Sequence, residues 1–463
     1  MAFLSKLSGW LWGGPLLIAF LVVGGWYSVR TGFFQIFHFP LWWKTSVGGL
    51  FGKKKKGEGK GVSQMQALSA ALAAIIGTGS IAGVATAIFY GGPGAVFWMW
   101  VSALIGMMTG FAEKTLAVRY REKGPDGQWR GGPMEYIGQG LRLPKLAKIF
   151  AFLGTVEALA GSNLAQSNSI STSLASAMGA DKLVVGLILA VLVSISLAGG
   201  IKRLGRITEL LVPLMALIFI GSGLAVIAFH WDAIPAAFGQ IIRYAFAPKA
   251  IVGGYSMGMA LRYGVARGVF TNEAGLGMSA IVHACADVKE PAEQGMRGIF
   301  EVFFSTMVIC TVTALVILTS GVYVPEDALT MIAGGVIPES MLGAPLVSAC
   351  FTTVFGGAGE WIVTVSLILF AFTSLLGAGY CGKRGLEYLT ASKWAMAAYH
   401  LLLPACVVLG AVADLTAVWE LVDLLCGLLA IPNLLALMLL SPEVLRLLRT
   451  CLKKKCKNNE NIA

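Results

Sequence analysis

Charged side chains are scarce in this chain. Only 13% of its 463 residues are Asp, Glu, Lys or Arg, whereas about 25% is usual in soluble globular proteins. Hydrophobic residues make up 57% of the chain and the mean hydropathy is +0.77. Many apolar runs reach the roughly 20 residues that a helix needs to cross the hydrocarbon core of a bilayer. This composition excludes an ordinary soluble enzyme and predicts an all-α integral membrane protein with one integral domain.

Two further signals are missing. The eight cysteines show no CxxC spacing, so we expect structural thiols and neither a metal centre, a disulfide framework nor a cofactor. No small-residue cleavage site follows the first apolar run, which Trp10 and Trp12 flank. We therefore expect this run to remain as a membrane helix and not to be removed as a signal peptide.

The apolar runs predict eleven transmembrane spans. The aromatic-rich stretch 31–51 predicts an amphipathic helix at the membrane interface, and a shorter interfacial stretch is expected at 238–246. The predicted spans cover residues 8–29, 63–90, 93–117, 148–178, 183–200, 207–229, 253–282, 297–320, 346–380, 394–413 and 416–440.

The basic residues lie mostly on one side of these spans. Of the 35 Lys and Arg residues, 28 fall in loops of one side and 4 in loops of the other. Because basic loops stay in the cytoplasm, this asymmetry predicts a multi-pass protein of the cell membrane with its N-terminus outside and its C-terminus inside. The run 53–56, four consecutive lysines, lies between spans. It indicates contact with the inner leaflet and not with nucleic acid.

Glycine-rich stretches interrupt two of the predicted spans. Residues 74–83 read AIIGTGSIAG and residues 267–277 read RGVFTNEAGLG. Unwound backbone inside a membrane must line a cavity or be buried in protein. Broken helices at corresponding positions of two halves indicate the midplane binding site of a secondary transporter.

The two breaks also suggest an internal repeat. With the first span set aside, ten remain, and they form two five-helix units of opposite orientation that each begin with a broken helix. This is a LeuT-type 5+5 inverted repeat with one extra N-terminal helix. The predicted parts are 1–62, the N-terminal helix with its interfacial helix and basic loop; 63–230, the first repeat; 231–441, the second repeat; and 442–463, a basic cytoplasmic tail.

Several motifs resemble those of a known family. The run 91–106, GGPGAVFWMWVSALIG, is similar to the signature of the alanine/glycine:cation symporters, also called sodium:alanine symporters. The segments 131–134, 166–170 and 264–277 are similar to further blocks of that family, in the same order along nearly the whole chain. The resemblance implies uptake of a small neutral amino acid with Na⁺, or sometimes H⁺, through a LeuT-like core in a bacterial inner membrane. No obligate protein partner is inferred.

The first break suits a carboxylate. Gly77 and Gly79 let the backbone leave helical geometry, and a half-helix that starts after them points N–H groups and its positive end at the cavity. Thr78 adds a hydroxyl. Ser80 stands where the family usually has Asn, which leaves a side-chain contact there in question. Close packing of helices on small residues is the alternative interpretation.

The second break and one further helix supply more candidate substrate contacts. Phe270 would wall the substrate, with plain core packing as the alternative, while Thr271 and Asn272 offer hydroxyl and amide groups. By resemblance, Gln166 falls where the family holds its substrate; the alternative is that it only joins helices by hydrogen bonding.

An ionisable residue at membrane depth is expected to be functional. We expect Glu273 to pair with Arg267 as a gate or structural clamp. Ion or proton coupling and a direct substrate contact are the alternative roles of Glu273.

The resemblance to LeuT-type cores also implies a sodium site. Hydroxyls of Thr373 and Ser374 would join the carbonyls of Ala74, Gly77 and Phe370, and five hard oxygen ligands suit a hard cation. Ser374 would also border the substrate. The alternative is that both hydroxyls bond their own helix.

Ala378 marks a departure from the family, which often has Trp there, and predicts a pocket for a mid-sized neutral amino acid. The eighth span also departs: Ser305 stands where the family carries Asp, which removes a buried carboxylate. Because of these departures, the alanine/glycine specificity of the family is not carried over directly.

Other classes of protein remain as alternatives. A cation channel or a non-transporting amino-acid sensor could share the fold, although repeated charge or carbonyl rings are not visible. A membrane hydrolase using Ser80 and His283 is disfavoured because the two residues are predicted at different membrane depths. We therefore expect a symporter and not an enzyme.

Overall fold

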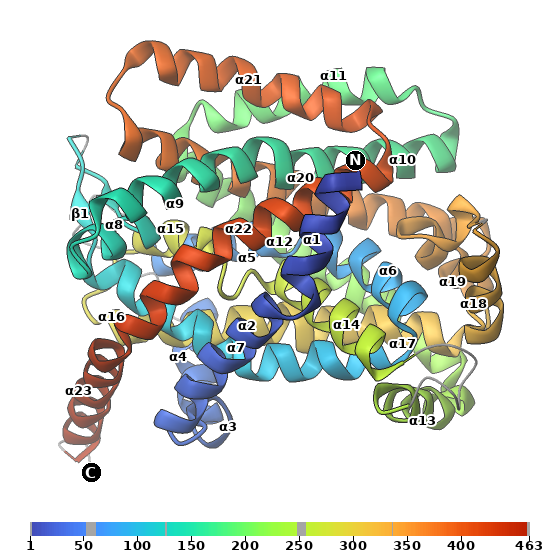
Figure 1. Cartoon of the computed structure of the whole chain (residues 1–463), viewed down its shortest axis with the longest axis horizontal. Helices are drawn as coiled ribbons and strands as arrows, with labels where there is room; N and C mark the ends of the chain where they lie inside the picture. The colour runs from blue at the N-terminus through green and yellow to red at the C-terminus, as the bar shows by residue number, and fades with distance from the viewer. Residues whose placement is uncertain (1, 52–61, 126, 248–255, 336, 461–463) are drawn as a thin grey trace.

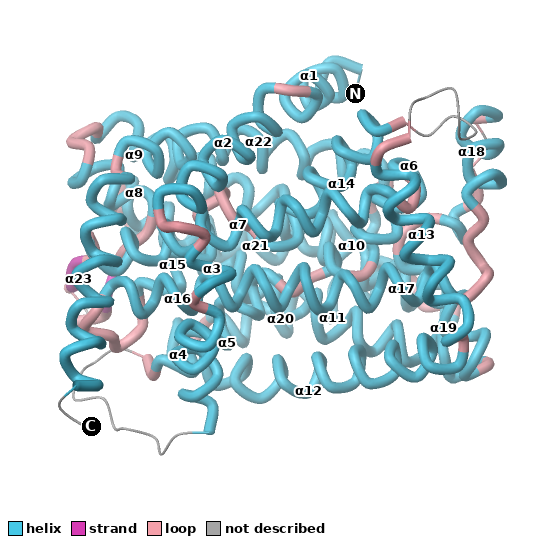
Figure 2. Tube along the Cα trace, turned by 90° about the horizontal axis from the view of Figure 1, so that it is seen from below, coloured by secondary structure: helices cyan, strands magenta, loops and turns pink. Residues whose placement is uncertain are grey.

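The computed structural model describes residues 2–51, 62–125, 127–247, 256–335 and 337–460. Helices build almost all of this part of the chain (Figures 1 and 2). A two-stranded antiparallel hairpin, β1 (Glu122–Lys123) and β2 (Trp129–Arg130), lies in the connection after α7. The run of lysines at 53–56 lies outside the described residues.

Among the described residues, seven helical segments are long and apolar enough to cross a membrane. Lys6–Arg30 is made of α1 (Ala2–Gly13) and α2 (Pro15–Arg30). Pro291–Thr319 is made of α16 (Pro291–Val302), the π-helix η5 (Phe303–Cys310) and α17 (Thr311–Thr319). The other five are α7 (Gly94–Arg119), α12 (Gly200–Phe229), α20 (Gly357–Leu389), α21 (Lys393–Val412) and the segment Val418–Leu439 of α22 (Leu415–Leu439).

The predicted fourth and fifth spans are present as helices too. The fourth is α9 (Pro144–Val156), the π-helix η3 (Glu157–Ser162) and α10 (Asn163–Met178), and the fifth is α11 (Lys182–Leu197). The remaining short elements are α3 (Phe34–Phe37), α4 (Phe39–Phe51), α8 (Pro133–Glu135), η2 (Tyr136–Gly140), η4 (Trp231–Ala233), α13 (Ile234–Ala245), α18 (Pro325–Gly334), η6 (Glu339–Met341), α19 (Ala344–Phe355) and α23 (Ser441–Glu460).

Both glycine-rich segments are broken helices, as predicted. The first consists of α5 (Gln64–Ile75), the single 3-10 turn η1 (Thr78–Ser80) and α6 (Ala82–Gly91). Ser63 starts α5 with a capping box, in which its hydroxyl accepts the N–H of Gln66. The second consists of α14 (Met257–Asn272) and α15 (Met278–Ala284), joined by an irregular turn.

The predicted ninth span, 346–380, is wrong in its bounds. Gly356 has φ +55°, a left-handed conformation that ends α19 and turns the chain. A separate helix, α20, then runs for 33 residues to Leu389. The predicted interfacial stretch 31–51 is two helices, and Trp42 of α4 is 1% exposed because it packs among Phe39, Trp43 and Phe303.

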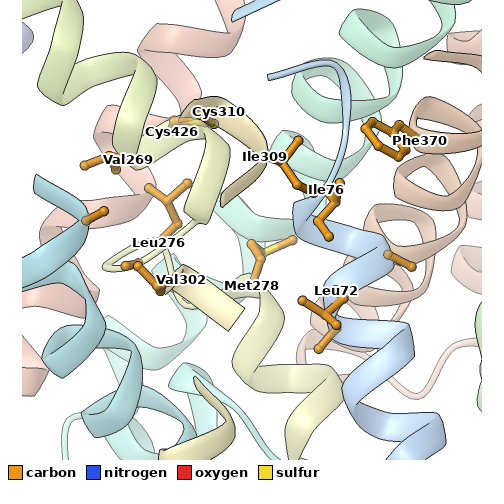
Figure 3. Close-up of a cluster of buried hydrophobic side chains, with 14 of the residues drawn as sticks. Leu72, Ile76, Val269, Leu276, Met278, Val302, Ile309, Cys310, Phe370 and Cys426 are labelled. Carbon is orange, nitrogen blue, oxygen red and sulfur yellow. The ribbon is translucent and has the colours of Figure 1, made fainter. Parts of the chain in front are cut away.

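Packing brings the two breaks into one buried region. Helix α7 packs against α14 and α16, and α20 packs against α5, α9 and α10. Figure 3 shows apolar side chains from both breaks in a single cluster, with Ile76 at the end of α5, Leu276 in the second break and Phe370 on α20. These side chains exclude water from the backbone that the breaks leave unpaired.

Candidate functional site: two helix breaks that meet

The first break is held open by a side chain from α10. Gly77 is extended, with φ −118° and ψ −154°, so the N–H of the following residue cannot bond within a helix. Gln166 takes this role, because its Oε1 accepts the N–H of Thr78 at 3.1 Å. Both residues are buried, with Gln166 5% and Thr78 0% exposed. A polar contact across 88 residues of sequence therefore stabilises the unwound backbone.

Gly77 is the point where three elements converge. A Cβ added to it would lie 2.6 Å from Ser374 Oγ and 2.7 Å from Gln166 Nε2. Only glycine leaves room for these two polar groups to approach the backbone so closely. The structure thus brings together four of the predicted site residues, namely Gly77, Thr78, Gln166 and Ser374.

Ser374 faces the end of α5. Its hydroxyl lies 3.0 Å from the carbonyl oxygens of both Ala73 and Ala74. Thr373 points elsewhere: its hydroxyl donates to Phe370 O at 3.0 Å within α20 and lies against the Met215 sulfur. Of the predicted sodium ligands, Ala74, Gly77 and Ser374 are therefore neighbours, whereas Thr373 and Phe370 bond to each other.

The Ser374 hydroxyl and the carbonyls of Ala73 and Ala74 place three hard oxygens beside the first break. Hard oxygen ligands suit Na⁺ and not a transition metal. The described residues contain no group of three or more His, Cys, Asp or Glu side chains placed to hold a metal ion. The oxygen set beside Ser374 is accordingly the candidate cation site.

The second break touches the first at Gly79. A Cβ added to Gly79 would lie 2.9 Å from Thr271 Oγ1 and 3.0 Å from the Phe270 ring. Thr271 also donates to Arg267 O at 2.7 Å. The Phe270 ring packs edge-on against Trp419 of α22, with 5.1 Å between ring centroids. Phe270 and Thr271 therefore border the first break, and their contact with substrate stays a prediction.

Asn272 has a structural task in the second break. Its Oδ1 accepts the N–H of Ala274 at 3.0 Å, and its Nδ2 donates to Thr306 Oγ1 at 3.2 Å. The side chain thus caps the end of α14 and ties it to η5. Both sides of the amide are already engaged by protein.

The predicted pairing of Arg267 with Glu273 is wrong. Arg267 instead binds Asp423 of α22 through two hydrogen bonds of 2.7 and 2.9 Å, and its guanidinium lies 4.7 Å above the Trp419 ring. Glu273 adopts a left-handed conformation, with φ +51°. Its Oε2 is buried and, within the described part of the chain, has no hydrogen-bond partner.

Two predicted substrate residues are less well defined by their contacts. The carbonyl of Ser80 accepts the hydroxyl of Thr313 at 2.8 Å, while the buried Ser80 Oγ has no partner among the described residues. Ala378 is half-buried and packs against the hydrophobic core. Both positions remain predictions as substrate contacts.

The sequence reasoning overlooked several polar side chains around the second break. Asp423 and Trp419 were not singled out, nor were Glu113 and Asn433, which both contact Gly275. Ionisable residues inside predicted spans are rare and functional by default. Glu113 and Asp423 lie within the predicted spans 93–117 and 416–440, so this signal was present in the sequence.

The two broken helices meet at their breaks, and Gln166 of α10 and Ser374 of α20 contact the first break. This arrangement defines a secondary transporter of the LeuT type. Solved structures share the fold. MhsT in complex with L-phenylalanine superposes with a TM-score of 0.58 at 13% identity, covering 83% of this chain and 90% of that one. The manganese transporter of Eremococcus coleocola gives a TM-score of 0.50 at 13% identity, over 83% of this chain and 78% of that one.

The chain belongs to the sodium:alanine symporter family, whose sequence profile matches residues 1–463. It is 39% identical to the sodium/alanine symporter AgcS of Methanococcus maripaludis, over 96% of this chain and 95% of that protein. It is 38% identical to the uncharacterized transporter YflA of Bacillus subtilis, over 96% and 92%. It is 34% identical to the probable sodium/glutamine symporter GlnT of Bacillus subtilis, over 96% and 89%. The family that the sequence motifs resembled is thereby confirmed.

Proposed function

We propose that this protein imports a small or mid-sized neutral amino acid together with Na⁺ by alternating access. The observation that carries the proposal is the convergence at Gly77, where the backbone of the first break, the Gln166 amide and the Ser374 hydroxyl meet in a buried position. Such a site offers donors to a carboxylate and oxygens to a cation side by side. H⁺ is the alternative coupling ion.

Membership of the family supports the ion and the class of substrate. Relatives of this chain include a sodium/alanine symporter and a probable sodium/glutamine symporter. We infer that the substrate carboxylate meets the backbone at Gly79 and the buried Thr78 hydroxyl, which has no partner among the described residues, and that Phe270 and Thr271 border it from the second break. Ala74, Gly77 and Ser374 would hold Na⁺. Thr373 would join them only after its hydroxyl leaves the Phe370 carbonyl of the same helix.

The proposal includes an orientation and a division into moving parts. We propose that the N-terminus lies outside and the C-terminus in the cytoplasm, because most basic residues lie in loops of one side. The repeats 63–230 and 231–441 would contribute one broken helix each to the moving body. Arg267 and Asp423 would close the outer side, because residues 257–272 precede the second break in a span predicted to run from outside to inside.

Uptake by purified protein in proteoliposomes tests the proposal. An inward Na⁺ gradient should drive accumulation of radiolabelled L-alanine or L-glutamine, and excess unlabelled substrate inside should support counterflow. If neither a Na⁺ nor an H⁺ gradient drives accumulation of any neutral amino acid, the proposal fails. Ion conduction without saturable uptake would favour the channel alternative.

Two matched glycine variants locate the site within the same assay. Gly79→Ala places a Cβ 2.9 Å from Thr271 Oγ1, whereas Gly83→Ala meets its nearest neighbour, the same oxygen, at 4.0 Å. We expect Gly79→Ala to lose at least tenfold in transport and Gly83→Ala to stay within twofold of the wild type. Equal activity of the two variants would exclude Gly79 from the substrate site.

A further inference from the structure

The backbone of the second break is held from two sides at a single residue, Gly275. Its N–H donates to Glu113 Oε1 of α7 at 2.9 Å. Its carbonyl accepts Asn433 Nδ2 of α22 at 2.9 Å. With φ +98°, and with an added Cβ only 2.3 Å from the Phe20 ring, this position requires glycine. Both loose backbone groups of the residue are thus satisfied by side chains.

Glu113 and Asn433 also bind each other. Asn433 Nδ2 donates to the same Glu113 Oε1 at 2.7 Å, and Asn433 Oδ1 accepts the hydroxyl of Tyr136. Since every donor and acceptor of the Asn433 amide is placed by a partner, the side chain has a fixed orientation. The carboxylate and the carboxamide form one clamp around the Gly275 peptide unit.

A buried ion cluster completes the surroundings of Glu113. Lys114 Nζ lies 3.2 Å from Glu113 Oε2 and 3.3 Å from Glu301 Oε2, and all three side chains are 0% exposed. Glu301 Oε2 also lies 3.2 Å from His283 Nε2 on α15. The turn at Gly275 and the half-helix that follows it are therefore tied to the same set of charges on α7 and α16.

Arg297 fixes the protonation state of His283 through a relay. An arginine can only donate, so the Gln294 Oε1 that lies 2.9 Å from Arg297 Nη1 is the acceptor. Gln294 Nε2 then faces His283 Nδ1 at 2.6 Å and must donate to it. The imidazole is consequently neutral, carries its proton on Nε2 and donates to Glu301. Glu301 Oε2 therefore accepts from both His283 Nε2 and Lys114 Nζ.

We propose that Glu113 is a positioning residue for the substrate site: its carboxylate sets the backbone of the second break through Gly275, and thereby places Phe270 and Thr271 against Gly79. The effect on transport rests on the proposed function. The clamp itself does not depend on the proposed function, because the hydrogen bond from the Gly275 N–H to Glu113 Oε1 belongs to the fold. Lys114 lies 3.2 Å from the other oxygen of the same carboxylate.

The test separates the length of the Glu113 side chain from its charge. Glu113→Asp keeps the charge beside Lys114 but withdraws the oxygen from Gly275, whereas Glu113→Gln keeps an oxygen at the same reach. Glu301→Gln is the matched control, because it removes a charge from the same lysine without touching Gly275. Hydrogen–deuterium exchange of residues 273–278 in the purified full-length protein reports the clamp directly, and the KM for L-alanine and L-glutamine reports the site.

Glu113→Asp should speed exchange in 273–278 at least tenfold and raise the KM of the transported amino acid at least tenfold, with the maximal rate changed less. Glu113→Gln and Glu301→Gln should stay within about threefold in both measurements. If Glu113→Asp leaves exchange and KM unchanged, or if Glu301→Gln matches its losses, the positioning role is refuted.

Asn433→Ala gives a second route if Glu113→Asp does not fold. It removes the clamp from the carbonyl side and should speed exchange in the same segment tenfold, and slow exchange there would refute the clamp. A wild-type protein that protects 273–278 but transports no neutral amino acid would overturn the proposed function and leave the clamp standing. Loss of protection with an unchanged KM would show that Gly275 does not position the site.

Discussion

Arg267 and Asp423 join the second broken helix to α22 through a two-pronged ion pair. Nη1 and Nη2 of the guanidinium lie 2.7 and 2.9 Å from the two carboxylate oxygens, and the pair lies beside the Trp419 ring that also packs on Phe270. Paired N–H···O bonds of this kind are both strong and geometrically selective. The ion pair therefore contacts the Trp419 ring that packs on Phe270, the aromatic residue expected to wall the substrate.

The first prediction follows from this geometry. Arg267→Lys keeps the charge but cannot present two parallel donors. Loss of a hydrogen bond to a charged group costs about 1.5–3 kcal/mol, so we expect uptake to fall roughly tenfold or more. Arg267→Gln and Asp423→Asn should have similar effects, and the double variant Arg267→Gln/Asp423→Asn should be no worse than the more damaged of these two single variants. Fully additive losses would show that the two residues act independently.

The second prediction distinguishes two neighbouring hydroxyls. Ser374→Ala removes an oxygen that lies 3.0 Å from the carbonyl of Ala74, so the Na⁺ concentration for half-maximal uptake should rise about tenfold. Thr373→Ala removes a hydroxyl that bonds its own helix and should shift it less than threefold. Uptake titrated with Na⁺ at constant ionic strength measures both. A larger shift for Thr373→Ala would mean that this residue turns toward the ion during transport.

The third prediction concerns the size of the substrate. Ala378 is half-buried on α20, one turn after Ser374, where the family often has Trp. An apolar pocket distinguishes substrates by about 1–3 kcal/mol per methylene and excludes larger ones more strongly. Ala378→Trp should therefore shift competition from mid-sized amino acids toward alanine and glycine. An unaltered competition profile would refute the larger pocket, and alanine as the wild-type substrate would show that neighbouring side chains fill the space.

The fourth prediction is a pH dependence of stability. Glu135 lies in the connection between α7 and α9, outside the membrane-spanning helices, and is 6% exposed. Burial raises its pKa to about 7, partly opposed by a backbone hydrogen bond and by Arg384. Because the folded protein holds this proton more tightly than the unfolded chain, the free energy of unfolding should decrease as pH rises from about 4.5 to 7, by about 1–3 kcal/mol.

Glu135→Gln removes the titrating group and isolates its contribution. The variant should lose this decrease and unfold at a higher temperature than the wild type at pH 8, with little difference near pH 4.5. Thermal unfolding in detergent between pH 4.5 and 8.5 measures the effect. The same pH dependence in both proteins would assign it to another group.

The two helix breaks could be predicted from the sequence because they are local properties of the chain. Glycine at 275 and 277 permits backbone of positive φ that other residues adopt only at a cost, and glycine at 77 and 79 leaves room for close polar and aromatic contacts. A span rich in such positions unwinds where partners satisfy its backbone groups. The first break extends from Ile76 to Ile81 and the second from Glu273 to Gly277. Both lie inside the predicted segments.

The sequence could not predict in the same way which side chains of a helix face a given neighbouring helix. Neighbours on a helix point about 100° apart, so Thr373 and Ser374 cannot both face α5 without a local change. The sequence supplied the two hydroxyls, and the packing of α20 on α5 selected Ser374. The turn at Gly356, which shortened the predicted ninth span, likewise depended on backbone geometry that apolar composition does not encode.

The sequence by itself determined the membrane class, the family and the places where two helices break, since composition, motifs and glycine act locally. Only the tertiary structure decided which charges pair. Arg267 lies six residues from Glu273 but binds Asp423, 156 residues away, and Glu113 reaches Gly275 across 162 residues. A buried charge requires a partner at short distance in space, and the packing of α7, α14 and α22 against one another sets that distance.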